Sequence, residues 1–459
     1  MSNLPEPNIF KAYDIRGVVN KTLTTETVEQ IGQSLGSYAL LKKQTKICVG
    51  FDGRLSSPFL CEVLLKGLLS SGIDVINIGL VTTPMLYFST HLLETHTGVM
   101  ITGSHNPPEY NGFKMMVDGS TLSPAEIQAL YQRILDNDFT KGKGTLDHKD
   151  IKSLYLKKIK DNIQLKRKMV VSIDCGNGSA GICAEELFSS LGVKVNSLFC
   201  NVDGNFPNHH PDPSNPKNLI DLQNNLKKSD SEIGLAFDGD GDRLGVVTKS
   251  GEIIYPDRQL LLFAESVLSK NPGATIIFDV KSTRHLFKWI KDRSGKPLIW
   301  KTGHSLIKAK MKENGALLAG EMSGHTFFAD RWYGFDDGLY AGARLLEILS
   351  HFDDPSKVLE ALPKGFSTPE LNIMLEEGEQ HELIKTLQAD AKFDDAIEII
   401  TIDGLRVEYV DGFGLMRASN TTPVIVLRFE ADTLEALQRI QSQFRTILEK
   451  YLPATLITF

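Results

Sequence analysis

The stretch Ile47-Cys-Val-Gly-Phe-Asp52 sets the plan of most of the chain, because its pattern recurs twice further along. A short apolar run ends in an aspartate, and Val170-Val-Ser-Ile-Asp174 and Thr275-Ile-Ile-Phe-Asp279 repeat this arrangement. Short apolar runs bounded by polar residues predict buried strands of the kind found in parallel sheets. Their recurrence at roughly 100-residue spacing predicts three similar domains.

Each of these segments contains a second apolar run that ends in a polar loop. The three runs are Val99-Met-Ile-Thr-Gly-Ser104, Ile233-Gly-Leu-Ala-Phe-Asp238 and Leu317-Leu-Ala-Gly-Glu321. Helical stretches such as 59–69 and 184–191 lie between the strands, and this alternation predicts α/β domains with mainly parallel central sheets flanked by helices. In such sheets the loops after the strands build the functional site.

The last part of the chain, from about residue 363, follows a different pattern. Strand-like pieces at 397–402, 404–410 and 424–429 precede an amphipathic helix predicted over 434–452. This pattern favours a smaller α+β domain with a mostly antiparallel sheet. The predicted domains are therefore 1–150, 151–252, 253–362 and 363–459, arranged around a central cleft.

The composition is that of an ordinary globular enzyme. The 459 residues are 41% hydrophobic and 23% charged, with a net charge of -7 and no basic block, so nucleic acid is not an expected partner. No apolar run approaches the roughly 18–20 residues of a membrane span, and the first residues lack a signal-peptide pattern. The five cysteines form no CxxC pair, which is typical of reduced, buried thiols. We therefore expect a cytoplasmic protein without a membrane partner.

The segment Gly98-Val-Met-Ile-Thr-Gly-Ser-His-Asn-Pro-Pro-Glu-Tyr-Asn-Gly-Phe-Lys114 presents one hydroxyl group, that of Ser104. Two prolines prevent a helix from starting there and fix the path of the chain after the loop. A rigidly presented serine suits a covalent nucleophile or a phosphate carrier. An ordinary surface turn has the same composition, so this segment alone leaves both possibilities open.

The segment Asp238-Gly-Asp-Gly-Asp242 contains three carboxylates that alternate with glycines. In an extended backbone, side chains two residues apart project to one side. Three oxygen ligands suit a hard divalent cation, Mg²⁺ or Ca²⁺. A solvated acidic turn is the weaker alternative, because three adjacent anions repel one another unless a cation neutralises them.

Two further loops have the composition of binding sites. Gly320-Glu-Met-Ser-Gly-His325 offers a carboxylate and a hydroxyl for vicinal sugar hydroxyls, and Arg417-Ala-Ser-Asn-Thr-Thr-Pro423 offers donors for an anion. Each could equally be a polar turn. Cationic residues near other strand ends favour one shared anionic ligand; they are Arg16 beside Tyr13, Arg54, Lys281 and Arg284. Together the loops predict phosphoryl transfer on a phosphorylated sugar.

With these four loops the chain resembles the α-D-phosphohexomutase superfamily and, within it, the bacterial phosphomannomutase/phosphoglucomutase group. The resemblance spans essentially the whole chain and rests on four motifs in order: 102–107, 238–243, 320–325 and 417–423. It implies interconversion of the 1-phosphates and 6-phosphates of mannose and glucose. Ser104 would act as a phosphoserine, and the intermediate would be a 1,6-bisphosphohexose, with glucose 1,6-bisphosphate as activator.

The resemblance also implies a role for each matching residue. Mg²⁺ would be held by Asp238, Asp240, Asp242 and a phosphoserine oxygen of Ser104. Glu321 and Ser323 would hold the sugar O3 and O4, and the non-reacting phosphate would be bound by Arg417, Ser419, Asn420 and Thr421 with help from Tyr13. The residues that would line the reaction centre are Arg16, Lys114, Arg243, Lys281, His304 and His325. Lys114 and His325 are the candidate general acid and base.

Sugar specificity within the resemblance depends partly on Met322, since phosphoglucosamine mutases usually carry glutamine at this place. We therefore expect use of both mannose and glucose phosphates by a monomer. Phosphoglucosamine mutase, a sugar-phosphate phosphatase and a non-catalytic sugar-phosphate or cation-binding module are the alternatives. The sequence leaves open the ratio of the two sugar activities and the pathway served.

Overall fold

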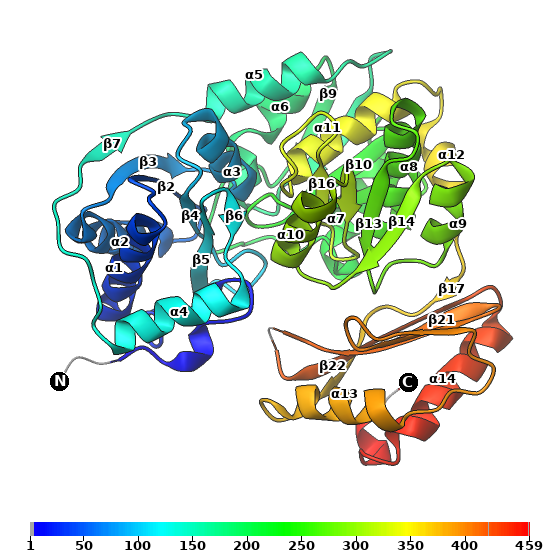
Figure 1. Ribbon diagram of the computed structural model, residues 1–459. Coiled ribbons are helices and arrows are strands. Elements are labelled where there is room, and N and C mark those ends of the chain that lie inside the picture. Colours follow the sequence, from blue (N-terminus) through cyan, green and yellow to red (C-terminus); the bar gives the residue numbers. More distant parts are fainter. Residues whose placement is uncertain (1–3, 421, 458) are drawn as a thin grey trace.

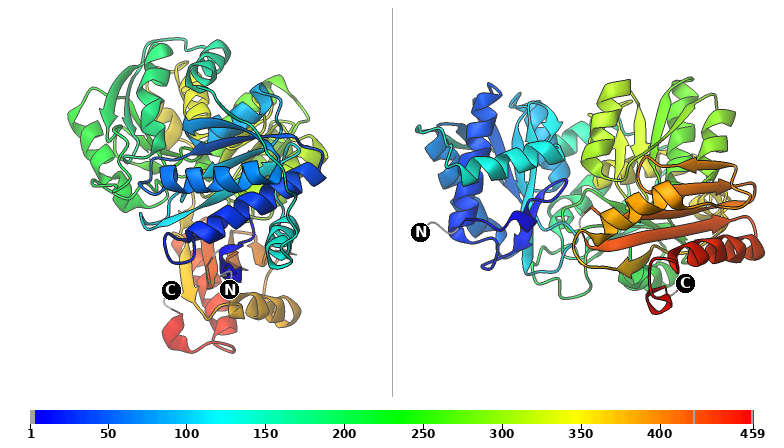
Figure 2. Two further views of the ribbon diagram at one scale, coloured as in Figure 1. Left: turned by 90° about the vertical axis from the view of Figure 1, so that its left-hand side faces the viewer. Right: turned by 60° about the horizontal axis from the view of Figure 1, so that its bottom comes forward.

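The structure is a computed structural model that describes residues 4–420, 422–457 and 459. Within this part of the chain the strands form four separate sheets, one for each predicted domain (Figure 1). The expected fold class is therefore confirmed: three α/β domains are followed by a C-terminal α+β domain. Figure 2 shows the last domain lying against one side of the other three.

The first three sheets share one arrangement of their central strands. In each, the first strand of the repeat lies in the middle, with parallel partners on both sides, in the orders β4-β2-β3, β10-β8-β9 and β15-β13-β14. An antiparallel strand then follows beside β4, β10 and β15; these are β5, β11 and β16. The predicted parallel centre is thus confirmed, and the antiparallel additions make the sheets mixed.

The first domain begins with the described N-terminal residues. Its elements are η1 (Pro7–Ile9), β1 (Ile15–Val18), α1 (Thr25–Leu41), β2 (Lys46–Phe51), α2 (Ser57–Ser71), β3 (Asp74–Leu80), α3 (Thr83–Leu92), β4 (Gly98–Ile101), β5 (Tyr110–Val117), β6 (Ser120–Thr121), α4 (Pro124–Leu135) and β7 (Leu146–His148). Side chains alternate between the two faces of β2. Ile47 and Val49 pack toward α1 and α2, whereas Cys48 joins the cluster that contains α3.

The second and third domains follow the same pattern. Their elements are α5 (Lys152–Asn162), β8 (Val170–Asp174), η2 (Ser179–Ile182), α6 (Ala184–Ser190), β9 (Lys194–Leu198), η3 (Pro216–Leu219), α7 (Ile220–Lys228), β10 (Ile233–Phe237), β11 (Leu244–Thr248), β12 (Ile253–Ile254), α8 (Pro256–Lys270), β13 (Thr275–Asp279), α9 (His285–Asp292), β14 (Lys296–Trp300), α10 (His304–Asn314), β15 (Leu318–Gly320), β16 (Thr326–Phe328), α11 (Gly338–Leu349) and α12 (Pro355–Glu360). The strands predicted at 170–174 and 275–279 and the helix predicted at 184–191 match these bounds closely.

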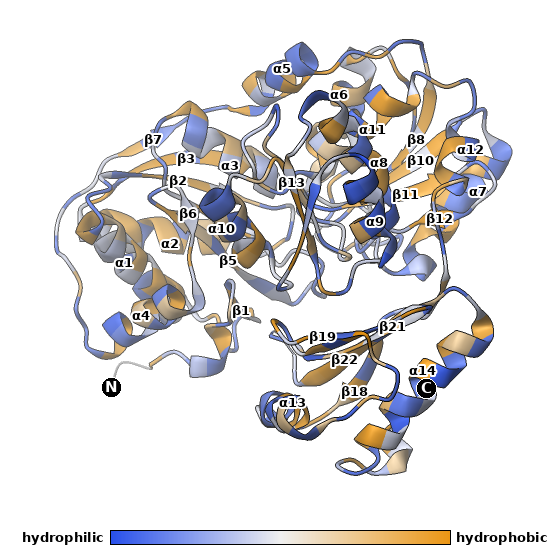
Figure 3. Ribbon diagram, turned by 45° about the vertical axis from the view of Figure 1, so that its right-hand side comes forward, coloured by the Kyte–Doolittle hydropathy of each residue, from blue (hydrophilic) through white to orange (hydrophobic). Residues whose placement is uncertain are grey.

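One continuous hydrophobic cluster joins the first three domains. It runs from Phe88 on α3 through Tyr155 on α5 and Phe237 on β10 to Phe278 on β13. Helix α11 contacts β10 and β11 of the second sheet as well as β16 of the third. This core crosses the expected domain limits at residues 150 and 252, so it does not separate one domain from the next. The domain limits therefore stay a prediction. Figure 3 shows mainly hydrophobic strands inside this body and hydrophilic segments on outer helices such as α10.

The C-terminal domain has its own core and an antiparallel sheet. Its elements are β17 (Phe366–Ser367), β18 (Leu371–Met374), α13 (Glu379–Asp390), β19 (Glu398–Ile400), β20 (Leu405–Tyr409), β21 (Gly412–Ala418), β22 (Val424–Ala431), α14 (Leu434–Leu448) and η4 (Ala454–Leu456). Helix α14 ends at Leu448, so the prediction that it continues to residue 452 was wrong. The chain reaches Pro453 shortly afterwards, and a residue preceding proline is disfavoured in helical conformation.

Among the described residues, no helix is long and apolar enough to cross a membrane. All five cysteines are free thiols, and four are buried, but Cys200 is only half-buried.

Candidate active site

The four predicted loops converge on one cavity of about 740 Å³. They follow β4, β10, β15 and β21, so each domain contributes one loop. The predicted residues that line the cavity are Tyr13, Arg16, Arg243, Lys281, His304, Glu321, Met322, Ser323, His325, Arg417, Ser419 and Asn420. Ser104, Lys114 and the three aspartates of the second loop are buried just behind this lining. Thr421 lies outside the described residues.

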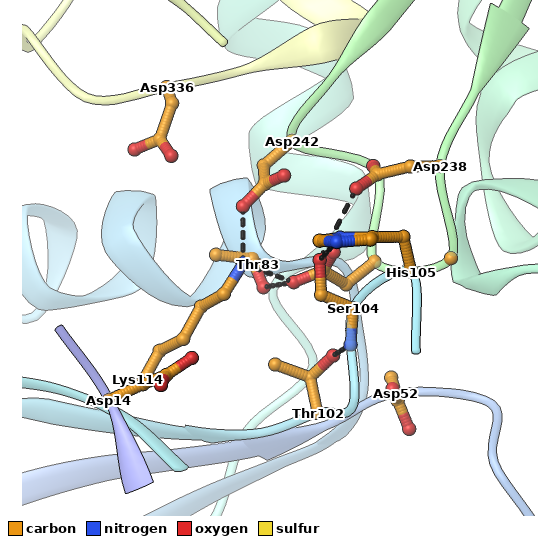
Figure 4. Close-up of polar contacts among 12 residues, drawn as sticks. Asp14, Asp52, Thr83, Thr102, Ser104, His105, Lys114, Asp238, Asp242 and Asp336 are labelled. Carbon is orange, nitrogen blue, oxygen red and sulfur yellow. Dashed lines mark hydrogen bonds and ion pairs between the residues drawn. The ribbon is translucent and has the colours of Figure 1, made fainter. Parts of the chain in front are cut away.

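Ser104 sits in the loop after β4 in a left-handed conformation, with a φ of +50°. Its amide donates to Thr102 Oγ1 at 2.7 Å, and its Oγ lies 3.1 Å from His105 Nδ1 and 3.5 Å from Asp238 Oδ2 (Figure 4). The backbone of the second loop approaches closely, since a Cβ on Gly239 would lie 2.4 Å from the Ser104 carbonyl oxygen. The serine hydroxyl therefore points at the acidic loop.

The acidic loop brings the oxygens of Asp238, Asp240 and Asp242 within 4.8 Å of one another. All three side chains are fully buried. Among the described residues, Asp240 Oδ1 and Asp242 Oδ1 receive no hydrogen bond, although each is shielded from solvent. Buried carboxylate oxygens in this state are costly unless a cation binds them. The residues present therefore fit a hard divalent cation.

The pKa shifts of the aspartates also indicate that the acidic loop requires a nearby positive charge. Burial, followed by repulsion from Asp242 and Asp240, raises the pKa of Asp238 well above its ordinary value. Burial also acts to raise the pKa of Asp240, but Lys114 outweighs it and the pKa falls below the usual range. Lys114 Nζ lies 2.7 Å from Asp240 Oδ2 and 2.5 Å from Asp242 Oδ2. Thr83 Oγ1 also donates to Asp240, at 2.5 Å.

The two candidate proton-transfer residues lie on opposite sides of Asp242. Burial acts to lower the pKa of Lys114, but Asp240 and Asp242 raise it well above its ordinary value, so this lysine holds its proton. His325 Nδ1 lies 3.0 Å from Asp336 Oδ2, and His325 Nε2 accepts a hydrogen bond from Arg243 Nε at 3.1 Å. His325 Nδ1 also lies 3.5 Å from Asp242 Oδ1. Burial lowers the pKa of His304 well below its ordinary value.

The loop after β15 presents Glu321 to the cavity. Glu321 Oε1 accepts a hydrogen bond from the Gly303 amide at 2.6 Å, and burial raises the pKa of this carboxyl group. The Met322 amide donates to Asp279 Oδ1 at 3.3 Å, which fixes the loop to the end of β13. Ser323 is half-buried. This geometry leaves a carboxylate and a hydroxyl available for a polyol.

The loop after β21 presents Arg417, whose Nε lies 3.0 Å from Asp403 Oδ2. Burial acts to lower the pKa of Arg417, but Asp403 outweighs it and raises the pKa. Asn420 Nδ2 donates to the Tyr13 hydroxyl, which in turn donates to the Thr302 carbonyl at 2.9 Å. Tyr13 from the first domain thus contacts the loop of the last domain, as expected for two parts of one binding site.

Some functional neighbours were not found from the sequence. His105 and Asp336 contact Ser104 and His325 directly, and Lys308 Nζ holds the other Asp336 oxygen at 2.9 Å. His105 could have been found, because it is next to the serine in the motif. Asp336 and Lys308 lie on other segments and lack a motif of their own.

Two of the cationic residues expected to share an anionic ligand do not face the cavity. Arg54 is buried under the serine loop, where it binds backbone carbonyls. Arg284 donates to the Val410 carbonyl of the C-terminal domain at 2.7 Å. The expectation was wrong for these two, because a strand end can also use an arginine to fix a neighbouring loop or domain. Lys281 lines the cavity, 2.6 Å from Glu370 Oε1.

Comparison with known proteins agrees with this geometry. Models of phosphoglucomutase/phosphomannomutase domains match the chain in order: α/β/α domain I over residues 7–141, domain II over 153–251, domain III over 255–366 and the C-terminal domain over 370–447. A phosphoglucomutase from Neisseria meningitidis is 59% identical over 452 residues, covering 98% of each chain. A phosphomannomutase/phosphoglucomutase from Pseudomonas aeruginosa is 56% identical over 443 residues, covering 96% of each.

A solved structure is similar over its full length. The crystal structure of a phosphoglucomutase/phosphomannomutase family protein from Burkholderia thailandensis superposes with a TM-score of 0.94 at 54% identity. The match covers 98% of this chain and 99% of that one.

Proposed function

The chain belongs to the phosphoglucomutase/phosphomannomutase family, and from this membership we propose how its residues interconvert hexose 1-phosphates and 6-phosphates. The reaction is reversible phosphoryl transfer on glucose and mannose phosphates. The observation that carries the proposal is the convergence of four loops, one from each domain, on a single cavity. Each loop supplies a different requirement of the reaction: a carrier hydroxyl, an acidic cluster, a polyol contact and an anion contact.

Ser104 carries the phosphoryl group as phosphoserine. In the first half-reaction the bond between Ser104 Oγ and phosphorus breaks, and a bond from phosphorus to the free substrate hydroxyl forms. The hydroxyl proton passes to a base of the site, Ser104 Oγ takes up a proton from an acid of the site, and the product is a bound 1,6-bisphosphohexose. The second half-reaction returns the other phosphoryl group to Ser104, so the substrate and product differ only in the position of phosphate.

Asp238, Asp240 and Asp242 would hold Mg²⁺ together with a phosphoserine oxygen of Ser104. When bound there, this cation would supply positive charge to neutralise the phosphoryl group during transfer. Lys114 keeps the acidic loop in place through its two ion pairs, and it is the proposed proton donor. His325, with Asp336 beside Nδ1, presents Nε2 as the proton acceptor once Arg243 turns to the substrate.

The sugar must bind in two orientations for both phosphates to reach Ser104. Glu321 and Ser323 hold O3 and O4, which occupy equivalent places when the sugar is turned over. Arg417, Ser419, Asn420 and Thr421 bind the phosphate that is not reacting, with Tyr13 at their side. Contacts to O3 and O4 do not involve C2, where mannose and glucose differ, so both sugars are substrates.

The first experiment measures conversion of mannose 1-phosphate and glucose 1-phosphate to their 6-phosphates. The assay contains Mg²⁺ and a trace of glucose 1,6-bisphosphate. Wild type converts both sugars, and Ser104→Ala loses at least about 100-fold in rate because the carrier is absent. Ser269→Ala, which changes an exposed serine of α8, is the matched control and keeps full activity.

Other outcomes would identify the alternatives. Isomerisation of glucosamine phosphate without turnover of either sugar would indicate phosphoglucosamine mutase and overturn the proposed specificity. Release of inorganic phosphate as the main product would indicate a phosphatase. Full activity of Ser104→Ala would overturn the phosphoserine mechanism.

Three further properties belong to the proposal. Mg²⁺ is the metal, glucose 1,6-bisphosphate is the activator, and the enzyme is a cytoplasmic monomer. Light scattering at working concentration tests the monomer, since the mass of a single chain is 50.9 kDa. A measured mass near twice this value would contradict it.

A further inference from the structure

The loop that carries Ser104 is held from below by one buried arginine. Arg54 Nη2 donates to the carbonyls of Ser104 at 2.9 Å and Asn106 at 2.6 Å. Arg54 Nη1 donates to the carbonyls of Pro107 at 2.6 Å and Tyr110 at 3.0 Å. The guanidinium group therefore binds four backbone oxygens that span the loop. Its side chain is only 1% exposed.

Asp52, the aspartate that directly follows β2, completes this arrangement from the other side. Asp52 Oδ2 lies 3.3 Å from Arg54 Nε and accepts the Gly103 amide at 3.2 Å. Asp52 Oδ1 accepts the Arg54 amide at 3.0 Å and the Ser57 hydroxyl at 2.5 Å. Figure 4 shows this carboxylate beneath the Ser104 loop. The pair of Arg54 and Asp52 thus donates to the carbonyls of the serine loop and accepts from its amide.

The second domain covers the arginine. The Phe206 ring lies 5.3 Å from the centre of the guanidinium group. A Cβ on Gly204 would lie 2.5 Å from the Leu55 amide nitrogen, so the two domains touch through backbone at this point. A Cβ on Gly103 would lie 2.5 Å from Arg54 Cζ, so the loop lies directly on the guanidinium plane. This packing prevents the arginine from taking another rotamer.

We propose that Arg54 is the positioning residue of Ser104: it fixes the path of residues 104–110 so that the serine keeps its left-handed conformation and faces the acidic loop. The carbonyls of Ser104, Asn106 and Pro107 lie outside the strands, and Tyr110 is the first residue of β5, so side-chain donors are required to hold the loop between β4 and β5. A planar guanidinium group with five N–H donors can bind carbonyls on both edges, whereas an ammonium group cannot copy this geometry.

Arg54 does not line the substrate cavity, which separates its role from substrate binding. The residues proposed to hold the sugar and the distal phosphate lie on the loops after β15 and β21, far along the chain. Loss of Arg54 is therefore expected to lower kcat and to leave KM nearly unchanged. A displacement of about 1 Å at a reacting atom costs about 100-fold in rate.

The test compares Arg54→Lys and Arg54→Ala with wild type after each has been treated with glucose 1,6-bisphosphate. We expect kcat to fall about 100-fold in both variants with KM within about twofold. Added guanidinium ion at a non-denaturing concentration is expected to restore part of kcat in Arg54→Ala, because it refills the same cavity. It should not help Arg54→Lys, whose side chain occupies that space.

Arg344→Lys is the matched control. Arg344 is also buried, lies 2.8 Å from a carboxylate oxygen of Asp330 and stacks over Phe328 at 4.4 Å, but it has no contact with the serine loop. Its variant is expected to lose thermal stability like Arg54→Lys while keeping kcat. If both variants lose kcat in proportion to their stability, or if guanidinium has no effect on Arg54→Ala, the positioning role is wrong.

This inference rests on the proposed role of Ser104, and the two can fail separately. Full activity of Ser104→Ala would overturn the mechanism itself. An inactive Ser104→Ala together with a fully active Arg54→Lys would overturn only the role of Arg54.

Discussion

Asp337 shows how strongly the interior acts on a single carboxyl group. It is fully buried and accepts hydrogen bonds from the Tyr155 hydroxyl, Trp332 Nε1 and the Tyr340 amide. Burial raises its pKa from 3.8 to about 7, against the opposing effect of these donors. The folded protein therefore binds a proton here at pH values where the unfolded chain has released it.

This shift predicts a pH-dependent contribution to stability. The contribution is fully present below pH 3.8, where both states are protonated, and is lost as the pH rises through about 7. Asp337→Asn mimics the neutral carboxyl, so its melting temperature relative to wild type should rise between about pH 4 and pH 7 and level off above that range. The linked free energy is about 1.4 kcal/mol for each pH unit of this window. Melting curves that shift in parallel across this range would contradict the prediction.

Glu321 allows a second prediction about an individual side chain. Glu321→Gln keeps the size of the group but removes its charge, and hydrogen bonds to a charged group contribute about 1.5–3 kcal/mol. We expect kcat/KM to fall about 100-fold, by the same factor for mannose 1-phosphate and glucose 1-phosphate. Steady-state kinetics on both sugars measures this, with the exposed Glu313→Gln as control. A much larger loss for one sugar would show that Glu321 senses C2.

At the level of single loops and strands, the acidic loop 238–242 depends on its cation. Chelation of Mg²⁺ should abolish turnover and lower the melting temperature, because the three buried carboxylates then keep only Lys114 and Arg243 as nearby Lys or Arg partners among the described residues. Binding of a ligand at 100 times its Kd stabilises a fold by about 2.7 kcal/mol. A titration of Mg²⁺ followed by melting temperature measures this, and Asp240→Asn should shift the midpoint to higher Mg²⁺. No Mg²⁺ effect on melting would contradict the assignment.

The same elements show what could be predicted from the sequence. The strands that lead to Asp52, Asp174 and Asp279 are short apolar runs in the sequence. This pattern alone is enough to predict that they are buried strands. The added strands β5, β11 and β16 were not predicted, because they pair across loops whose geometry is set by distant contacts. The four motif loops were likewise found from the local sequence, whereas Lys114 and His304 were assigned to the site only through the family resemblance. Asp336 and Asp403 act only through the partners that the fold brings to them.

Considered as a whole, the molecule joins its C-terminal domain to the rest mainly through polar contacts. Arg406 Nη1 donates to the Val280 and Ser282 carbonyls at 2.7 and 2.6 Å, and Thr283 Oγ1 donates to Glu430 at 2.7 Å. The apolar part of this interface is a small cluster around Val280 and Phe413. Interfaces of this kind permit relative domain movement.

We therefore expect the C-terminal domain to close when the distal phosphate binds. Glucose 1,6-bisphosphate should reduce the radius of gyration measured by X-ray scattering, because Arg417 then draws the last loop toward the sugar. Arg417→Ala should show no such reduction, whereas Arg439→Ala, a change on the outer side of the same domain, should behave like wild type. An unchanged radius in wild type at saturating ligand would contradict closure.

The shared strand order of the first three domains has a consequence for how such a protein can change over time. Asp52 directly follows β2, and Asp279 ends the corresponding strand β13. Each carboxylate accepts a hydrogen bond from an amide in the loop that follows the neighbouring strand, at Gly103 and Met322 respectively. The scaffold that supports a loop is thus copied, while the loop itself differs. Duplicated units of this design can exchange one chemical task for another by altering a handful of codons at a strand end, without rebuilding the interior. The simplest evolutionary history for this architecture is duplication of one domain, followed by specialisation of the loop in each copy.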